Sequence, residues 1–334
     1  MENKSVDFSS VIISKEKIET IESAMAQLKY NDLIFDTWGF SKIFEKGTAV
    51  SMIFFGIPGT GKTLMAQAIA NKLNEKLLVV GPAEIETSVP GGAERNIKKY
   101  FGIAEGTVAP QKLDENGQPI FAPNGVPVVG QKTKHVLLFD ECDSLITDRG
   151  KVGMIIAGQI NTLLSELERF TGVIIFTTNR LGQLDPAIER RISVKVDFPF
   201  PNKEQRERIW ERMIPREAPI DKDVNYKKLS EVPLTGGNIK NVVLAAARIA
   251  AYNKSASIKL DYFLDAIEKE IEGIAKFEAA FKDIKNNFRN TAEDFSREET
   301  GGLSIKKDRK LEKDIKTKKE EEVNNSYNNE LSKK

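Results

Sequence analysis

The stretch IFFGIPGTGKTLMAQAIA, residues 53–70, decides how the rest of this sequence is interpreted. It begins with apolar residues typical of a buried strand, continues through a glycine-rich turn and ends in an amphipathic helical pattern. Within the turn, Gly56, Gly61, Lys62 and Thr63 satisfy the pattern G-x-x-x-x-G-K-[ST] of phosphate-binding loops. The alternative is a chance match, which the strand before the turn and the helix after it make less attractive.

The residue types of this turn suit the binding of a phosphate chain. Gly56, Gly59 and Gly61 allow backbone dihedrals that are closed to other residues, so successive N–H groups can converge on one anion. The helix that begins near Gly61 adds the positive end of its dipole. We therefore expect Lys62 to contact the β- and γ-phosphates of a nucleotide, and the Thr63 hydroxyl to bind Mg²⁺.

Composition excludes several classes of protein. The chain has 334 residues, of which 40% are hydrophobic, enough for one large domain or two small ones. Its net charge is +1, from 50 basic and 49 acidic side chains, which gives no global attraction to nucleic acid or to an acidic membrane surface. We accordingly expect neither nucleic acid nor membrane as a partner.

The compartment is expected to be the cytoplasm. A single cysteine, Cys142, excludes an intramolecular disulfide and fits a reducing environment. The first thirty residues carry charges every few positions, which is unlike a signal peptide, and no run approaches the ~18 apolar residues of a membrane span. The ATP-binding pattern starts so early that we expect no separate substrate-recruiting domain before it.

Two further strands are predicted to end in polar residues. The sequence VLLFDECDSLI begins at Val136 and places Asp140 and Glu141 at the end of a buried strand, where open α/β sheets bind ligands. The strand that begins at Val173 ends near Asn179. We expect Asp140 to hold Mg²⁺ through water, Glu141 to act as the general base, and Asn179 to bond the attacking water and the γ-phosphate. Ordinary charges at strand ends are the alternative.

Arg190 and Arg191 follow a helical turn just before the last predicted strand. This position is too far along the sheet for either arginine to reach its own nucleotide easily. The sharper hypothesis is that both point out of the subunit, into the nucleotide site of a neighbour, as arginine fingers. The plainer one is a solvated basic turn.

Five segments together resemble one family: GIPGTGKT at 56–63, LLFDECDSL at 137–145, FTTN at 176–179, LDPAIERRISVKVDFPFP at 184–201 and LTGGNIKNVVLAAARIAA at 234–251. Over residues 14–281 the chain resembles the AAA-type module of the AAA+ ATPases. Residues 210–241 resemble, more weakly, AAA ATPases encoded with phage-tail-like contractile injection systems.

The AAA+ resemblance implies a fold, a ligand and an assembly. The implied fold is the α/β fold of P-loop NTPases, a parallel five-stranded sheet of order 5-1-4-3-2 with helices on both faces, followed by an all-helical lid. The implied ligands are ATP and Mg²⁺, and the implied assembly is a homo-oligomeric ring, a hexamer, acting on an unknown protein substrate. The implied nucleotide-binding residues are Gly56, Pro58, Gly59, Thr60, Gly61, Lys62, Thr63 and Leu64, with Gly237 and Lys240 from the lid.

We expect five segments along the chain. They are a disordered N-terminus (1–13), a large α/β domain (14–201), an insertion within it (106–134), a helical lid (202–281) and a charged, flexible tail (282–334). The insertion contains two Asn-Gly turn signals and is expected to form a small hairpin or an irregular excursion at the amino edge of the sheet. It is interpreted either as a family-specific contact surface or as a tolerated insertion.

Several residues allow two interpretations. Trp38 and Phe40 are expected in the core, the alternative being that Trp38 lies against an adenine ring. Lys240 lies near the place where some AAA+ branches have a sensor arginine. It is interpreted either as a replacement for that arginine or as a solvated helix residue. Val89 stands where AAA unfoldases usually have an aromatic pore residue, which puts processive threading in doubt.

His135 is expected to be a strand-edge residue and not a metal ligand, and Cys142 a packing residue.

Three functions are compatible with these patterns. The first is a ring-forming, Mg²⁺-dependent ATPase that remodels or disassembles a protein complex. The second is a nucleic-acid-directed AAA+ loader, which would need a basic channel or a DNA-binding module, and neither is visible in the sequence. The third is a nucleotide-gated scaffold with little turnover.

Overall fold

The computed structural model describes residues 6–43, 49–112, 114, 118–122, 126–147, 154–180, 182 and 184–274. The chain divides into a unit of residues 1–270 and a unit of residues 271–334. In the second unit only residues 271–274 are described, and they are helical. The tail predicted over 282–334 and the last lid residues, 275–281, lie outside the described residues.

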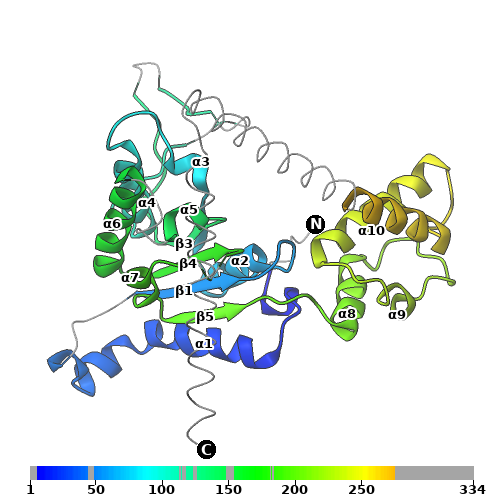
Figure 1. Ribbon diagram of the computed structural model, residues 1–334, viewed down its shortest axis with the longest axis horizontal. Coiled ribbons are helices and arrows are strands. Elements are labelled where there is room, and N and C mark those ends of the chain that lie inside the picture. Colours follow the sequence, from blue (N-terminus) through cyan, green and yellow to red (C-terminus); the bar gives the residue numbers. More distant parts are fainter. Residues whose placement is uncertain are drawn as a thin grey trace, which may run out of the picture. The chain divides into compact units, whose positions relative to one another are not determined.

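Five parallel strands form the central sheet (Figure 1). They are β1 (Val50–Phe55), β2 (Lys76–Val80), β3 (His135–Phe139), β4 (Val173–Thr178) and β5 (Val194–Asp197). Their order across the sheet is β2-β3-β4-β1-β5, which confirms the predicted order 5-1-4-3-2. Because all five strands run the same way, the residues that follow β1, β3 and β4 meet at one edge of the sheet.

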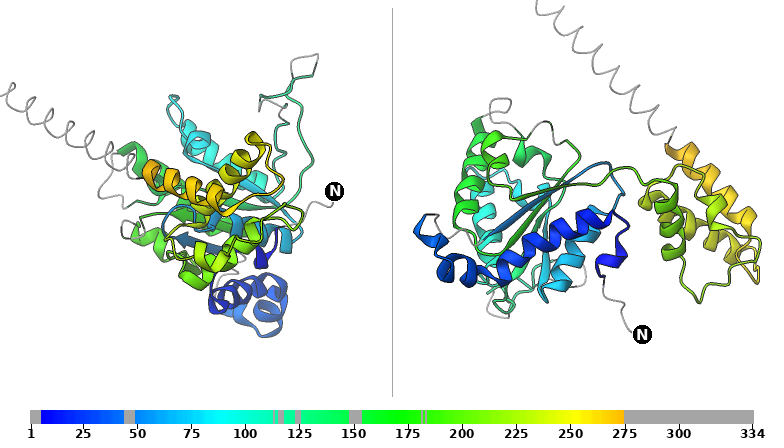
Figure 2. Two further views of the ribbon diagram at one scale, coloured as in Figure 1. Left: turned by 90° about the vertical axis from the view of Figure 1, so that its right-hand side faces the viewer. Right: turned by 90° about the horizontal axis from the view of Figure 1, so that it is seen from below.

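Helices cover both faces of this sheet, as predicted. Along β1, Met52 and Phe54 pack with α1 (Lys15–Lys29) and α2 (Lys62–Lys72), whereas Ile53 packs with α4 (Gly92–Ala104) and α6 (Met154–Arg169). This alternation follows from the two-residue period of a strand. Figure 1 shows α4 and α6 on one side of the sheet and α1 on the other, and the right-hand view of Figure 2 shows α1 lying across the strands.

Short helices follow three of the strands, β2, β3 and β4. They are α3 (Pro82–Ile85), α5 (Asp143–Ile146) and α7 (Pro186–Glu189). α3 is a single turn in the connection between β2 and α4. Proline at the first helical position and the bond from the Gly81 N–H to Glu84 Oε2, at 2.9 Å, stabilise this turn of helix.

The segment before α1 is ordered where the structure describes it. Residues Phe8–Ser10 form a 3₁₀ turn, η1, capped by Asp7, and the side chain of Val11 is only 5% exposed. Val11 packs into the core that α1 and α2 cover, with Phe8 against it. The prediction of disorder over 1–13 is therefore wrong for residues 6–13. The sequence does not reveal the burial of these apolar side chains, because they follow no helical or strand period.

The described residues after Pro201, up to residue 274, contain helices and no strand, which confirms the prediction for this part of the chain. It contains α8 (Lys203–Met213), α9 (Tyr226–Leu229), α10 (Gly236–Tyr252) and a helical segment over 260–270. These helices have a core of their own, in which Trp210 meets Phe263 edge to face with ring centroids 6.0 Å apart. No helix among the described residues has both the length and the apolar character needed to cross a bilayer.

The segment 106–134 pairs with itself as expected. Antiparallel bridges join Gln111 to Val129 and Phe121 to Pro127, and the Lys112 N–H donates to the Val128 carbonyl at 2.8 Å. The hairpin prediction is thus confirmed, although the two Asn-Gly turns lie outside the described residues. Phe121 and Val126 are 55% and 56% exposed, so this hairpin presents apolar side chains to solvent.

Candidate active site

The loop after β1 has the backbone that the glycine pattern predicts. Gly56 has φ +137°, and a Cβ placed on it would lie 2.2 Å from the carbonyl oxygen of Phe198, so only glycine fits there. Gly61 has φ +102° and directly precedes α2. The first N–H groups of α2 have no partner within the helix and face the loop side, where they can bind an anion.

Lys62 joins this loop to the end of β4. Its ammonium group donates to the carbonyls of Gly56 and Ile57, at 2.7 and 2.9 Å, and to Asn179 Oδ1 at 3.0 Å. Burial lowers the pKa of Lys62 below its ordinary value, and the carboxylates nearby oppose this shift. Lys62 and Asn179, which the sequence analysis expects near the γ-phosphate, therefore lie within hydrogen-bond distance of each other.

Thr63 and Asp140 lie in contact, as the Mg²⁺ hypothesis requires. The Thr63 hydroxyl is 3.2 Å from Asp140 Oδ1 and 3.1 Å from Oδ2. Both residues offer oxygen atoms only, which are the ligands that Mg²⁺ prefers. Among the described residues, no three or more histidine, cysteine or acidic side chains are placed so that they could hold a metal ion together. A cation that is held by one carboxylate, one hydroxyl and phosphate oxygens fits this set.

Glu141 occupies an unusual turn immediately after Asp140. Its φ is +51°, a left-handed conformation that few residues other than glycine adopt, and its side chain is exposed. The Glu141 N–H donates to Thr177 Oγ1 at 2.8 Å, which holds the peptide in this direction. Asn179 is exposed as well. Two acids and an amide thus border the phosphate loop, and Thr177 is a participant that sequence reasoning missed.

The lid touches the phosphate loop through the start of α10. The Gly237 N–H donates to the Gly59 carbonyl at 2.9 Å, and a Cβ on Gly59 would lie 2.8 Å from Thr235 Oγ1. The structure therefore brings Gly237 to the loop. Lys240, one turn further along α10, is exposed and is not brought into this contact.

A cavity of ≈ 160 Å³ opens beside the loop residue Thr60. Its apolar part comes from segments far apart in the chain, chiefly Ile12, Ile13, Phe198 and Ile209. Sequence reasoning missed this cavity, because no periodic pattern connects residues before the first helix with residues of α8. The only available signal was the apolar run of residues 11–13 just ahead of the helix start.

Arg190 and Arg191 differ in their surroundings. Arg190 is exposed. The guanidinium of Arg191 donates to the Ala187 carbonyl at 3.0 Å and pairs with Glu168 at the end of α6. In this structure Arg191 therefore contacts a carboxylate of its own chain, whereas the exposed Arg190 is the arginine that can extend toward a neighbour.

The sequence profile of the ATPase family associated with various cellular activities (AAA) matches residues 52–200. Residues 52–200 are an AAA domain. The match covers the phosphate loop, both acids, Asn179 and both arginines, whereas the lid residues and part of the cavity lining lie outside it.

Curated relatives carry the same domain. The 26S proteasome regulatory subunit 6A of Schizosaccharomyces pombe is 29% identical over 64% of this chain and 46% of its own length. The proteasome-activating nucleotidase of Sulfurisphaera tokodaii is 27% identical over 80% of this chain and 64% of its own length. The vesicle-fusing ATPase of Dictyostelium discoideum is 31% identical over 60% of this chain and 27% of its own length. The matched part is thus less than two thirds of each relative.

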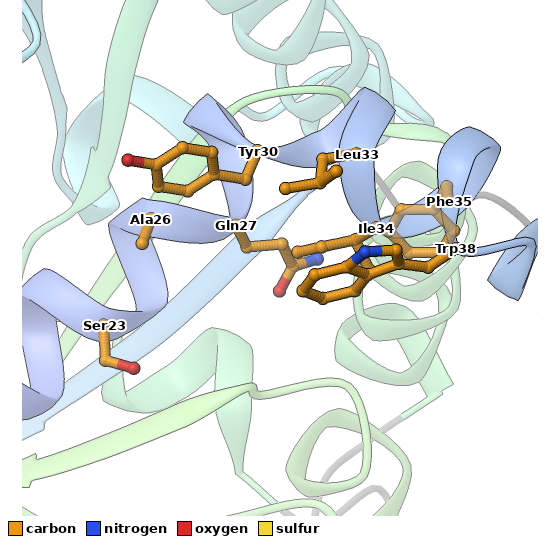
Figure 3. Close-up of a pocket in the computed structure, with 8 residues that line it drawn as sticks. All are labelled: Ser23, Ala26, Gln27, Tyr30, Leu33, Ile34, Phe35 and Trp38. Carbon is orange, nitrogen blue, oxygen red and sulfur yellow. The ribbon is translucent and has the colours of Figure 1, made fainter.

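Trp38 lies apart from the phosphate loop of the AAA domain. With Tyr30, Leu33 and Phe35 it lines a separate cavity of ≈ 490 Å³ between α1 and the turn η2 (Leu33–Thr37), as Figure 3 shows. Trp38 is 63% exposed and Phe40 is 44% exposed, so the prediction that both are core residues is wrong. The adenine alternative gains no support either, because no residue of the phosphate loop lines this cavity.

Val89 and His135 lie in two different parts of the AAA domain, one in a connection between helices and one in a strand. Val89 is 56% exposed in the connection between α3 and α4, where the resemblance places a pore loop. His135 is the first residue of β3, only 7% exposed, and belongs to no metal-binding cluster in the described part of the chain. The interpretation of His135 as a strand-end residue is confirmed.

Cys142 is expected to be chemically inert in the folded protein. Its side chain is 2% exposed, and burial raises the pKa of the thiol far above its ordinary value, so the reactive thiolate is scarce. At about pH 8.5 we expect iodoacetamide to label the folded chain at least ~100-fold more slowly than the urea-unfolded chain. Mass spectrometry of timed samples measures both rates. Equal rates would contradict the packing role.

Proposed function

We propose that this chain is a Mg²⁺-dependent ATPase, converting ATP and water to ADP and phosphate, that forms a homo-hexameric ring and remodels or disassembles a protein complex. The observation that carries the proposal is the meeting of Lys62, Thr63, Asp140 and Asn179 at one edge of the sheet. An ammonium, a hydroxyl, a carboxylate and an amide from three separate segments are the groups that phosphoryl transfer to water requires.

The roles follow from the contacts. Lys62 and the loop N–H groups would hold the triphosphate, while Thr63 and Asp140 would hold Mg²⁺, which supplies charge neutralisation at the phosphate oxygens. Glu141 would accept a proton from the attacking water, for which its exposed carboxylate is available. Asn179, within hydrogen-bond distance of Lys62, would orient that water.

The cavity beside Thr60 is the proposed site of the nucleotide base. It adjoins the loop, and its walls are mainly apolar, which suits the flat faces of a purine. Both the segment before α1 and the lid contribute to it, through Ile13 and Gly236. Bound nucleotide would thus touch three parts of the chain.

The ring is proposed from the arginines. Arg190 is exposed, so it can reach a neighbouring subunit, and Arg191 could follow if it left Glu168. A contact between two different surfaces of identical subunits closes into a ring when the rotation allows it. Two relatives are named for the proteasome and one for vesicle fusion, which supports a protein assembly as the object of this ATPase.

The predicted division of the chain is part of this proposal. Residues 14–201 would be the large domain and residues 202–281 the lid, in line with the separate apolar core of the helices after Pro201. The hairpin of 106–134 would be a contact surface, since it exposes Phe121 and Val126. We place the protein in the cytoplasm on the grounds given by its sequence.

The purified chain tests the proposal directly. Phosphate release from ATP is measured with Mg²⁺ and with EDTA, over a series of protein concentrations, and again with added DNA. We expect release only with Mg²⁺, and a rate per subunit that rises with concentration as rings assemble. ATP binding without release at any concentration would favour the scaffold. Stimulation by DNA would favour the nucleic-acid-directed loader.

A further inference from the structure

One buried hydroxyl contacts both acids of the site. Thr177, on β4, is 1% exposed, and β4 lies between β3 and β1 in the sheet. Its Oγ1 is 2.5 Å from Asp140 Oδ1 and 2.8 Å from the backbone nitrogen of Glu141. The same side chain therefore touches the carboxylate of one acid and the peptide of the next.

The direction of these two bonds is fixed by chemistry. The N–H of Glu141 can only donate, so Thr177 Oγ1 accepts there. The ionised carboxylate of Asp140 can only accept, so the single hydroxyl proton goes to Oδ1. Hydrogen bonds to ionised groups are short and strong, and a separation of 2.5 Å is in their range. The single proton of the Thr177 hydroxyl is thereby donated to Asp140, while its oxygen accepts from Glu141.

This arrangement has a consequence for each acid. With Oδ1 held by Thr177, rotation of the Asp140 carboxylate is restricted, and Oδ2 stays 3.1 Å from the Thr63 hydroxyl. Glu141 has φ +51°, which is disfavoured for glutamate, and the bond from its N–H to Thr177 stabilises that turn. The conformation of this turn therefore sets the direction in which the Glu141 side chain leaves the backbone.

We propose that Thr177 is a positioning residue that sets the directions of Asp140 and Glu141 together and links them to the strand that carries Asn179. The proposal rests on the function proposed above, because it gives Asp140 the role of holding Mg²⁺. Thr177 itself touches neither water nor phosphate, since it is buried. It acts only through the two acids.

Thr177→Val tests the proposal, because valine has nearly the same shape and lacks the hydroxyl. The first readout is the affinity for a non-hydrolysable ATP analogue, measured by calorimetry with Mg²⁺ and with EDTA. We expect Thr177→Val to weaken binding about tenfold with Mg²⁺ and less than about twofold with EDTA, since a charge-assisted hydrogen bond to Asp140 is lost. The second readout is ATP turnover, for which we expect kcat to fall about tenfold or more.

Two further variants separate positioning from packing. Thr177→Ser keeps the hydroxyl and should restore both readouts to within about threefold of the natural chain. Thr178→Val removes the neighbouring buried hydroxyl, which bonds Asp143 and not Asp140, and should lower the thermal midpoint while keeping the Mg²⁺ dependence. Thr177→Ala serves as the hydroxyl-free variant should the valine variant not fold.

The outcomes distinguish this proposal from the proposed function. If the natural chain binds the analogue equally with Mg²⁺ and with EDTA, the proposed function fails. If the natural chain shows Mg²⁺-dependent binding and the hydroxyl-free variants show the same dependence, the positioning role of Thr177 is overturned. Equal losses of Mg²⁺ dependence in Thr177→Val and Thr178→Val would also overturn it, because the effect would then be one of packing.

Discussion

Replacing Glu141 with glutamine is expected to lower ATP turnover at least ~100-fold, while ATP affinity stays within about twofold, because the amide keeps the size of the side chain but cannot accept the proton. The hydrogen bonds of the loop, Lys62 and Thr63 are kept in this variant, since the hydrogen bond from Glu141 to Thr177 runs through the backbone. The glutamine removes only the charge that Glu141 places near Lys62. Phosphate release measures turnover, and equilibrium binding of labelled ATP measures affinity. Size-exclusion chromatography with light scattering should show the assembled ring trapped with ATP.

Glu16→Gln is the matched control for this prediction. Glu16 is an exposed carboxylate in the first turn of α1, so the same change of charge is made outside the site. Its turnover should equal that of the natural chain. An unchanged rate in Glu141→Gln would remove Glu141 from its role as general base. Trapped Glu141→Gln rings, incubated with ATP in cell extract, also offer a way to identify the bound substrate.

Chains that carry Arg190→Ala and Arg191→Ala together should lose at least ~1,000-fold in turnover, since arginine fingers contribute 10³–10⁵ in phosphoryl transfer. Chains that carry Lys62→Ala should also be inactive, for a different reason, because they lack the ammonium that holds the phosphates. Mixing the two inactive chains should restore activity. In a random 1:1 ring about one quarter of sites combine an intact loop with a donated arginine, so we expect about one quarter of the natural rate.

Recovery on mixing requires that the rings contain both chains, which two different affinity tags confirm. The absence of recovery in confirmed mixed rings would remove the support for shared sites. Single variants sharpen the result: Arg190→Ala should lose more turnover than Arg191→Ala, because Arg191 is paired with Glu168 of its own chain. Arg216→Ala, a change at another exposed arginine, should leave turnover unaffected.

Much of the fold could be predicted because its signals are local. The apolar runs of β1, β3 and β4 are strands buried on both faces, and the runs place these strands to within about two residues, since β4 extends to Thr178 and β3 begins at His135. The meeting of Lys62 with Asn179, and of Thr63 with Asp140, follows from the rule that parallel strands end at one edge. These contacts need only the order of the strands, which the resemblance supplied.

Other features depend on packing that no local pattern shows. Trp38 was assigned to the core by its size alone, but its neighbours along the chain form a π-helical turn that leaves it 63% exposed. The pairing of Arg191 with Glu168 joins residues from two elements whose relative register is set only by the folded sheet. Thr177 was invisible for the same reason, since a threonine in an apolar strand is ordinary until its neighbours across the sheet are known.

The hydrogen bond between the Gly237 N–H and the Gly59 carbonyl attaches the first turn of α10 to the phosphate loop, so a rotation at this point would move the far end of the helix. The 17 residues of α10 span about 25 Å, so a rotation of about 10° at this point would carry the far end, near Tyr252, through about 4 Å. A small change of peptide orientation at Gly59 would thus displace the far end of α10 enough to alter a contact with another molecule. Amplification of this kind needs no flexible hinge in the helix itself, only a stiff rod attached at one end.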